Sequence, residues 1–176
     1  SLPMPQKTII YRRLDSLENG LFIDIINPDT QLQPLREELY LSKHFQLLSE
    51  IYQYNKDSIE FHIYYTKSCI SPRSWHIDGP TLKIFTYLTD VSVDHGPYAY
   101  QLCSHRYYDR EIANETSHLP LKTLKSNVSQ QYFNPKNIVS PTGIKGTSFI
   151  SNQSGIHRGL SQSVGLERYV LVVQLS

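Results

Sequence analysis

The stretch IEFHIYYTK at residues 59–67 is the first of several short runs rich in aromatic and β-branched side chains. Similar runs follow at 82–88 (LKIFTYL), 98–102 (YAYQL), 146–150 (GTSFI) and 168–175 (RYVLVVQL), with proline and glycine between them. Runs of this kind are typical of β-strands bounded by turns. Because no helical pattern separates them, a parallel α/β sheet is not expected. We predict a mainly β protein with a sandwich, barrel or jelly-roll core.

The part of the chain before these runs predicts two strands and one helix. The strands are expected at Thr8–Arg12 and Leu21–Ile26, with the turn-forming residues Glu18-Asn19-Gly20 between them. Residues 34–54 carry leucine, phenylalanine and isoleucine at roughly helical spacing, and Pro34 suits a first helical turn. We expect this helix to brace the sheet with its apolar face.

A chain of 176 residues is expected to form a single domain. We assign residues 1–57 to the N-terminal strands and bracing helix, and residues 58–176 to the β core. Residues 105–142 are polar and weakly periodic. A long excursion of this kind in a compact domain is commonly functional, so we expect a lid-like insertion there.

The charge balance argues against two classes of partner. Lys plus Arg is 17 and Asp plus Glu is 16, so the chain lacks the basic excess expected of a nucleic-acid or anionic-membrane binder. There is no apolar run of about 18 residues that could cross a membrane, and SLPMPQKTII at the N-terminus lacks a secretory pattern. We expect a cytoplasmic protein with a small-molecule partner, in which Cys69 and Cys103 are buried reduced thiols. The pattern does not indicate an oligomeric state.

The segment WHIDGP at residues 75–80 offers the first candidate site. Residues i and i+2 of a strand point to the same face, so His76 and Asp78 present an imidazole and a carboxylate side by side. The segment GIHRGL at 155–160 supplies a second histidine, His157. Two histidines and one carboxylate form the facial ligand set of non-haem Fe(II) oxygenases, which leaves other coordination positions open. The alternative is that His76 and Asp78 are structural residues of a strand, with their hydrogen bonds satisfied within the protein, and bind no metal.

Arg168 is the third part of the candidate site. If residues 161–166 close a turn, the chain returns Arg168 to the neighbourhood of His157. A guanidinium group there can bind a carboxylate through two hydrogen bonds. The alternative is a structural ion pair with Glu167 or Asp90.

Residues 74–106 (SWHIDGPTLKIFTYLTDVSVDHGPYAYQLCSHR) carry a family resemblance. The segment resembles the core of the phytanoyl-CoA dioxygenase-like family of Fe(II)- and 2-oxoglutarate-dependent oxygenases. The family pattern also includes His-Arg-Gly followed eleven residues later by Arg, which matches His157-Arg158-Gly159 and Arg168. The matching motifs along the chain are Trp75-His76-Ile77-Asp78, Thr89-Asp90-Val91, His95-Gly96-Pro97 and Cys103-Ser104-His105-Arg106.

The resemblance implies a double-stranded β-helix, a cupin-like jelly roll, with one or two flanking N-terminal helices. It implies that His76, Asp78 and His157 are the catalytic residues and bind Fe(II), and that Arg168 binds the distal carboxylate of 2-oxoglutarate, with O₂ as the other co-substrate. Two positions depart from the family. Gly159 stands where a serine is common, and Tyr87 is the nearest match to an aromatic residue in the strand after the aspartate.

Lys67 and Tyr65 lie in the strand expected at residues 59–67. If that face of the strand points into the barrel, their side chains could contact the co-substrate. The resemblance implies hydroxylation of a small molecule with release of succinate and CO₂, and the presence of Asp78 favours this over halogenation. Two alternatives stay open. One is a cupin-like β-barrel that binds a metal or metabolite without turnover, and the other is a metal-dependent isomerase.

Overall fold

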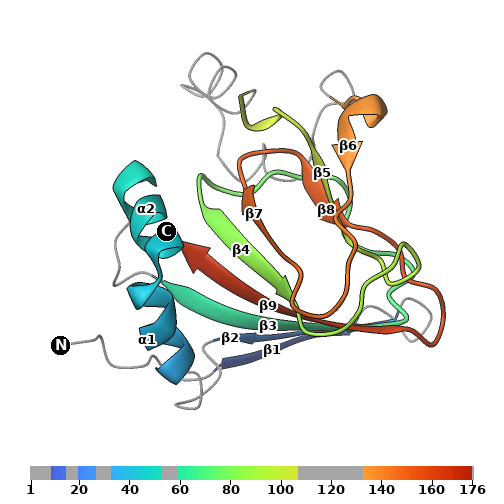
Figure 1. The fold of residues 1–176 in the computed structure, drawn as a ribbon. Coiled ribbons are helices and arrows are strands. Elements are labelled where there is room, and N and C mark those ends of the chain that lie inside the picture. The colour runs from blue at the N-terminus through green and yellow to red at the C-terminus, as the bar shows by residue number, and fades with distance from the viewer. Residues whose placement is uncertain (1–8, 15–19, 27–32, 53–58, 107–132, 176) are drawn as a thin grey trace.

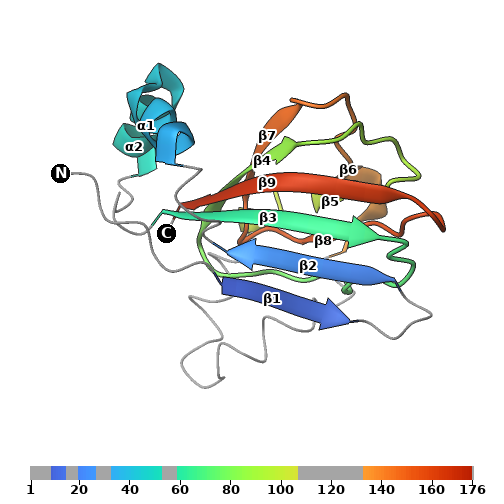
Figure 2. The same ribbon diagram turned by 90° about the horizontal axis from the view of Figure 1, so that it is seen from below.

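The computed structural model describes residues 9–14, 20–26, 33–52, 59–106 and 133–175, which form two antiparallel sheets and a pair of helices (Figure 1). The smaller sheet has the order β6 (Ile138–Val139), β5 (Tyr98–Gln101) and β8 (His157–Gly159). The larger sheet contains, in spatial order, β1 (Ile9–Leu14), β2 (Leu21–Ile26), β3 (Glu60–Lys67), β9 (Glu167–Leu175), β4 (Leu82–Tyr87) and β7 (Ser148–Asn152). The C-terminal strand β9 therefore lies in the middle of the larger sheet (Figure 2).

Two helices, α1 (Gln33–Leu41) and α2 (Lys43–Tyr52), replace the single helix expected over 34–54. The break falls at Ser42, whose hydroxyl oxygen accepts a hydrogen bond from the backbone N–H of Phe45 at 3.2 Å. A serine in this position caps the start of a helix, because its side chain satisfies an N–H that has no partner within the helix. Residues 53 and 54 lie outside the described part of the chain.

Each face of the larger sheet packs against a different apolar cluster. Phe45 of α2 joins Ile59, Phe61, Leu82, Val173 and Leu175 in a cluster that attaches the helices to the sheet. A second cluster contains Phe85, Tyr87, Val91, Tyr98, Val170 and Val172, and the presence of Tyr98 from β5 places it between the two sheets. The alternation of residues along β4 and β9 explains the division, since neighbouring side chains point to opposite faces.

The expected strands are present with small shifts at their ends. The shift is largest at β7, which spans Ser148–Asn152 where residues 146–150 were expected. The strand expected at Thr8–Arg12 is β1, which extends to Leu14, and Thr8 lies outside the described part of the chain. Of the expected turn at residues 18–20, the structure describes only Gly20, whose φ of +89° suits a glycine. Two short strands were not predicted, β6 and β8, because two or three residues are too few to show a period.

The predicted insertion at 105–142 is too long at its C-terminal end. The 3₁₀ helix η4 (Pro135–Asn137) leads into β6, and β6 pairs with β5 in the smaller sheet. Residues 107–132 lie outside the described part of the chain, so a lid there stays a prediction.

The cysteine prediction holds for one of the two thiols. Cys69 is buried, whereas Cys103 is exposed in a turn with a φ of +63°. Neither lies in a strand. None of the helices in the described ranges is long and apolar enough to cross a membrane.

Replacing Phe61 with alanine tests the contact between the sheet and α2. The Phe61 side chain is 1% exposed and lies in the cluster that contains Phe45. We expect Phe61→Ala to lower the free energy of unfolding by about 3–5 kcal/mol, because it removes a buried ring and leaves a cavity. Urea denaturation followed by circular dichroism measures the change. The control Ile144→Ala, at a side chain that is 74% exposed, should change it by less than about 0.5 kcal/mol. Equal losses in the two variants would contradict this packing.

Candidate metal centre

His76 and His157 face each other across a short antiparallel backbone bridge. The N–H of His76 donates to the carbonyl of His157 at 3.1 Å, and the N–H of His157 donates to the carbonyl of His76 at 2.9 Å. His157 begins β8, and His76 lies on the connection between β3 and β4. The bridge holds the two imidazole rings together, with their centroids 4.4 Å apart.

Both imidazoles are held in the same tautomer by the same local contact. The Nδ1 of His76 lies 2.7 Å from the carbonyl of Ser74, and the Nδ1 of His157 lies 2.8 Å from the carbonyl of Gly155. A carbonyl oxygen can only accept, so the hydrogen is on Nδ1 in each ring and the lone pair is on Nε2. Metal-binding histidines are commonly oriented in this way, with one nitrogen bonded to the protein and the other free for the ion.

Asp78 completes the group. Its backbone N–H donates to the carbonyl of Gln153 at 2.9 Å, which fixes the chain two residues after His76. One oxygen of its carboxylate lies 3.5 Å from the Nε2 of His157. Ligand atoms from His76, Asp78 and His157 all lie within 4.8 Å of one another. Because each offers an electron pair toward the others, the arrangement fits a cation held among them.

The protonation states of His76 and Asp78 suit a metal. Burial, and then the charge of His157, lower the pKa of His76 to about 4, so its imidazole is neutral at pH 7. Burial alone would raise the pKa of Asp78, but the neighbouring His157, Lys83 and His76 lower it overall, so its carboxylate is ionised at pH 7. A neutral imidazole and an ionised carboxylate are the forms that bind a metal ion.

Two cations that the sequence analysis did not select lie next to Asp78. The Nη1 of Arg73 is 3.6 Å from one carboxylate oxygen, and the Nζ of Lys83 is 3.9 Å from the other. Lys83 lies on β4, where alternation with Phe85 and Tyr87 directs it between the sheets. Burial lowers the pKa of Lys83, while the charges of Asp78 and Asp24 oppose the change. The alternation in LKIFTYL was the signal that could have found it.

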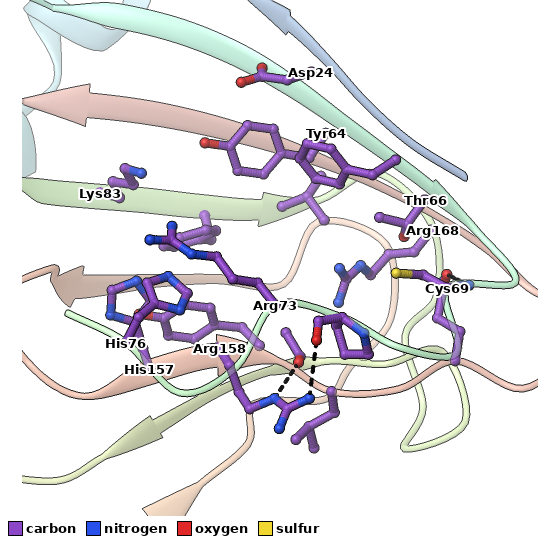
Figure 3. A pocket seen from close by; sticks show the side chains of 18 of the residues that line it. Asp24, Tyr64, Thr66, Cys69, Arg73, His76, Lys83, His157, Arg158 and Arg168 are labelled. Carbon is purple, nitrogen blue, oxygen red and sulfur yellow. Dashed lines mark hydrogen bonds between the residues drawn. The ribbon is translucent and has the colours of Figure 1, made fainter. Parts of the chain in front are cut away.

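A cavity of about 350 Å³ extends from this group between the two sheets. In Figure 3 the imidazoles of His76 and His157 lie at one end, and Arg168 and Thr66 lie at the other. The apolar part of the wall comes from Phe22, Phe85, Tyr87, Tyr98, Leu160 and Val170. The volume is near the lower end of the range for small-molecule sites, which is about 300–1,000 Å³.

The far end of the cavity contains polar atoms without partners. Among the described residues, four buried side-chain polar atoms have no hydrogen-bond partner, and three of them belong to Thr66, Gln162 and Arg168, which line the cavity. Thr66 and Arg168 are directly opposite each other on β3 and β9. The Nη1 of Arg168 donates to the carbonyl of Gly96, while its Nε has no partner. Buried polar groups are nearly always satisfied, so these atoms indicate a polar ligand.

The structural alternative for Arg168 is not observed. Glu167 pairs instead with Lys67 at 2.7 Å, and Asp90 accepts a hydrogen bond from the backbone N–H of Lys145 at 2.8 Å. Gly159 lies beside the guanidinium group, since a Cβ at this position would be 3.9 Å from the Nη2 of Arg168. The position where the family commonly has serine is therefore next to Arg168.

The remaining predicted residues divide into two groups. Tyr87 lines the cavity, but its hydroxyl already donates to the carbonyl of Pro141 at 2.7 Å. Lys67 and Tyr65 were expected to face the interior, and this prediction is wrong. Side chains alternate along β3, and the face that carries Tyr64 and Thr66 is the one that points into the cavity. Thr66 and Tyr64 line the cavity, and Lys67 is exposed in its pair with Glu167. The pairing of Thr66 with Arg168 in the folded sheet is what shows which side chains of β3 face the cavity.

Comparison with known proteins finds solved structures only. No family model matches the chain, and no curated protein matches it. The resemblance to the phytanoyl-CoA dioxygenase-like family therefore stays a prediction.

Of three similar structures, two are non-haem enzymes that depend on 2-oxoglutarate (α-ketoglutarate), and the third has nickel and 2-oxoglutarate bound. SnoN, a non-haem α-ketoglutarate-dependent epimerase from nogalamycin biosynthesis, matches with a TM-score of 0.62 at 14% identity over 98% of this chain and 68% of its own. SnoK, a carbocyclase from the same biosynthesis, matches with a TM-score of 0.64 at 14% identity over 93% and 67%. HygX from Streptomyces hygroscopicus with nickel and 2-oxoglutarate bound gives 0.54 at 15% identity over 97% and 73%.

These likenesses establish the fold. The chain folds as a double-stranded β-helix, as the resemblance implied, with two flanking helices on the N-terminal side.

Replacing Gly155 tests how tightly the support of His157 is packed. A Cβ at Gly155 would overlap the ring and hydroxyl of Tyr100. We expect Gly155→Ala to lower the free energy of unfolding by about 1–3 kcal/mol, because a rigid aromatic ring must move. In Gly79→Ala the new Cβ has no atom within 4 Å, so chemical denaturation should show a change of less than about 0.5 kcal/mol. A loss confined to Gly79→Ala would refute the packing.

Proposed function

We propose that this protein is an Fe(II)- and 2-oxoglutarate-dependent dioxygenase that hydroxylates a small molecule. One observation carries the proposal. Ligand atoms of His76, Asp78 and His157 gather at one end of a cavity whose other end holds the unpartnered polar atoms of Arg168 and Thr66. A 2-oxo acid needs this combination, because it chelates a metal through one end and presents a carboxylate at the other.

The protein's own residues have three tasks in this proposal. His76, Asp78 and His157 hold the iron, in the tautomers and charge states that their hydrogen bonds and surroundings set. Arg168 and Thr66 bind the distal carboxylate of 2-oxoglutarate, which satisfies their buried polar atoms. When bound, the iron supplies the oxidation in which O₂ and 2-oxoglutarate give succinate, CO₂ and one oxygen atom for the substrate.

The aromatic and aliphatic wall has the third task. Phe85, Tyr98 and Val170 line the cavity and are buried between the sheets. Apolar surfaces of this kind exclude water, which strengthens the charge interactions that orient the co-substrate. The hydroxyl of Tyr98 is bonded to Ser151 at 2.7 Å, so its ring is held in place without a polar atom left unpaired.

The similar structures support the class of chemistry more strongly than the reaction. HygX is described with nickel and 2-oxoglutarate bound, and also with hygromycin B. SnoN and SnoK are an epimerase and a carbocyclase, so this fold carries outcomes other than hydroxylation. We propose hydroxylation because the motifs resemble those of a hydroxylating family and because Asp78 is present. Binding of a metal without turnover is the second candidate, because Gly159 offers no hydroxyl beside Arg168.

Metal binding provides the first test. We expect the wild type to bind Mn(II) in anaerobic titration calorimetry, and Asp78→Ala and His157→Ala each to weaken it by at least about 100-fold, since even outer partners of metal ligands contribute 10- to 100-fold. His105→Ala, a histidine outside the ligand group, is the matched control and should bind normally. Unchanged Mn(II) affinity in both site variants would remove the proposed centre.

Co-substrate binding provides the second test. We expect Arg168→Met to weaken 2-oxoglutarate binding to the Mn(II)-loaded protein by about 10- to 100-fold, because a hydrogen bond to a charged group contributes about 1.5–3 kcal/mol. Thr66→Val should have a smaller effect of about 2- to 10-fold, as expected for a neutral donor. Mn(II) affinity should be retained in both variants.

Thermal shift with and without 2-oxoglutarate measures the binding, and succinate release with Fe(II) measures turnover. Loss of Mn(II) affinity in Arg168→Met would show that the arginine is structural. Intact binding of Mn(II) and 2-oxoglutarate, with no succinate formed across a broad set of substrates, would favour the non-catalytic β-barrel.

A further inference from the structure

The cavity is basic although the chain is almost neutral. Among the described residues, two negatively charged side chains line it, Asp24 and Asp78. Four positively charged side chains from the same described ranges also line it: Arg73, Lys83, Arg158 and Arg168. The whole chain has a formal charge of only +1. Positive charge is therefore concentrated where the proposed co-substrate and substrate would bind.

Most of these charges already have a partner or a proposed task. Asp24 accepts a hydrogen bond from the Nδ1 of buried His62 at 3.0 Å. The guanidinium of Arg158 donates to the carbonyl of Gly159 at 3.0 Å and lies over the ring of Trp75, 5.7 Å from its centroid. Arg168 is assigned to the distal carboxylate of 2-oxoglutarate. Arg73 and Lys83 remain, and the acid that they share is Asp78.

A metal ion competes with Arg73 and Lys83 for that carboxylate. Once a divalent cation takes Asp78, both side chains lose much of their counter-charge and lie near a centre of the same sign. The side chain of Lys83 is only 13% exposed, and a buried charge is costly without a partner. Arg73 is half-exposed, but its guanidinium cannot release a proton and stays positively charged beside the metal. The loaded cavity therefore favours a further anionic group.

We propose that the substrate carries a carboxylate or phosphate group, which Arg73 and Lys83 bind. The proposal rests on the function proposed above and narrows it to anionic small molecules. Lys83 projects from β4, and Arg73 projects from the connection between β3 and β4 (Figure 3). Both lie at the metal end of the cavity through their contacts with Asp78, so an anion held there places its neighbouring carbon atoms close to the oxidising centre.

Binding of matched probes tests the proposal. Wild-type protein saturated with Mn(II) and 2-oxoglutarate is titrated with 3-phenylpropionate, 3-phenylpropionamide and 3-phenylpropylamine, which differ in charge but share one ring and chain. Trp75 is the only tryptophan in the chain and adjoins His76, so its fluorescence reports on this site; calorimetry confirms the affinities. We expect the carboxylate to bind at least about tenfold more tightly than the amide, and the amine least tightly. Phenethyl phosphate shows whether phosphate or carboxylate is the preferred anion.

Variants assign the effect to the two cations. Arg73→Gln and Lys83→Met should each weaken binding of 3-phenylpropionate by about tenfold and leave binding of the amide unchanged. Arg73→Lys should restore part of the affinity, because the charge returns without the forked geometry. Lys43→Gln removes an equal charge from exposed Lys43 of α2, away from the cavity, and should bind every probe as the wild type does.

The outcomes separate the two proposals. If Mn(II) and 2-oxoglutarate bind but the carboxylate and amide bind equally, the anionic substrate is refuted and the proposed function survives. If Arg73→Gln and Lys83→Met weaken 2-oxoglutarate by the same factor as the probe, or if added 2-oxoglutarate displaces the probe, the two cations belong to the co-substrate and this proposal is wrong. If the wild type binds neither Mn(II) nor 2-oxoglutarate, the proposed function falls and this inference falls with it.

Discussion

The backbone bridge between His76 and His157 is the contact on which the candidate site depends. Two hydrogen bonds, of 3.1 and 2.9 Å, join the connection before β4 to the start of β8. They bring together two imidazoles from distant parts of the sequence, and each ring is then oriented by the carbonyl two residues before it. Asp78 needs no further element, because it follows His76 by two residues and its N–H is held by Gln153. The arrangement is therefore determined by backbone geometry more than by side-chain packing.

The two ends of the cavity present different electrostatic environments to a ligand. At one end Asp78 lies among histidines and cations, and at the other Arg168 and Thr66 keep polar atoms without partners. Unsatisfied buried polar atoms lower the stability of a protein. A fold that keeps three of them around one cavity trades stability for the capacity to bind a ligand that satisfies them. The apolar wall between the two ends keeps that interaction away from water.

The strands and the ligand set could be predicted because their signals are local. Short runs rich in aromatic and β-branched residues indicated β3, β4 and β9, and a period of two places His76 and Asp78 on the same face of a strand. What could not be predicted depended on pairing between distant segments. The register of β3 against β9 decides that Thr66, and not Lys67, faces Arg168, and nothing within the run IEFHIYYTK distinguishes the two choices. Ser42 divided the predicted helix through a capping bond that competes with an otherwise continuous apolar period.

The place of β9 in the middle of the larger sheet constrains the order in which the protein can assemble. β3 pairs with β9 across about 100 residues of sequence, as the contact between Lys67 and Glu167 shows. Until β9 arrives, β3 and β4 have no common neighbour, and Arg168 is absent from the cavity. Long-range pairing requires the entropy of closing a large loop before any contact stabilises it, so folding is slow. During synthesis, His76 and Asp78 are therefore present in the chain before β9 has been made and before the cavity around them can form.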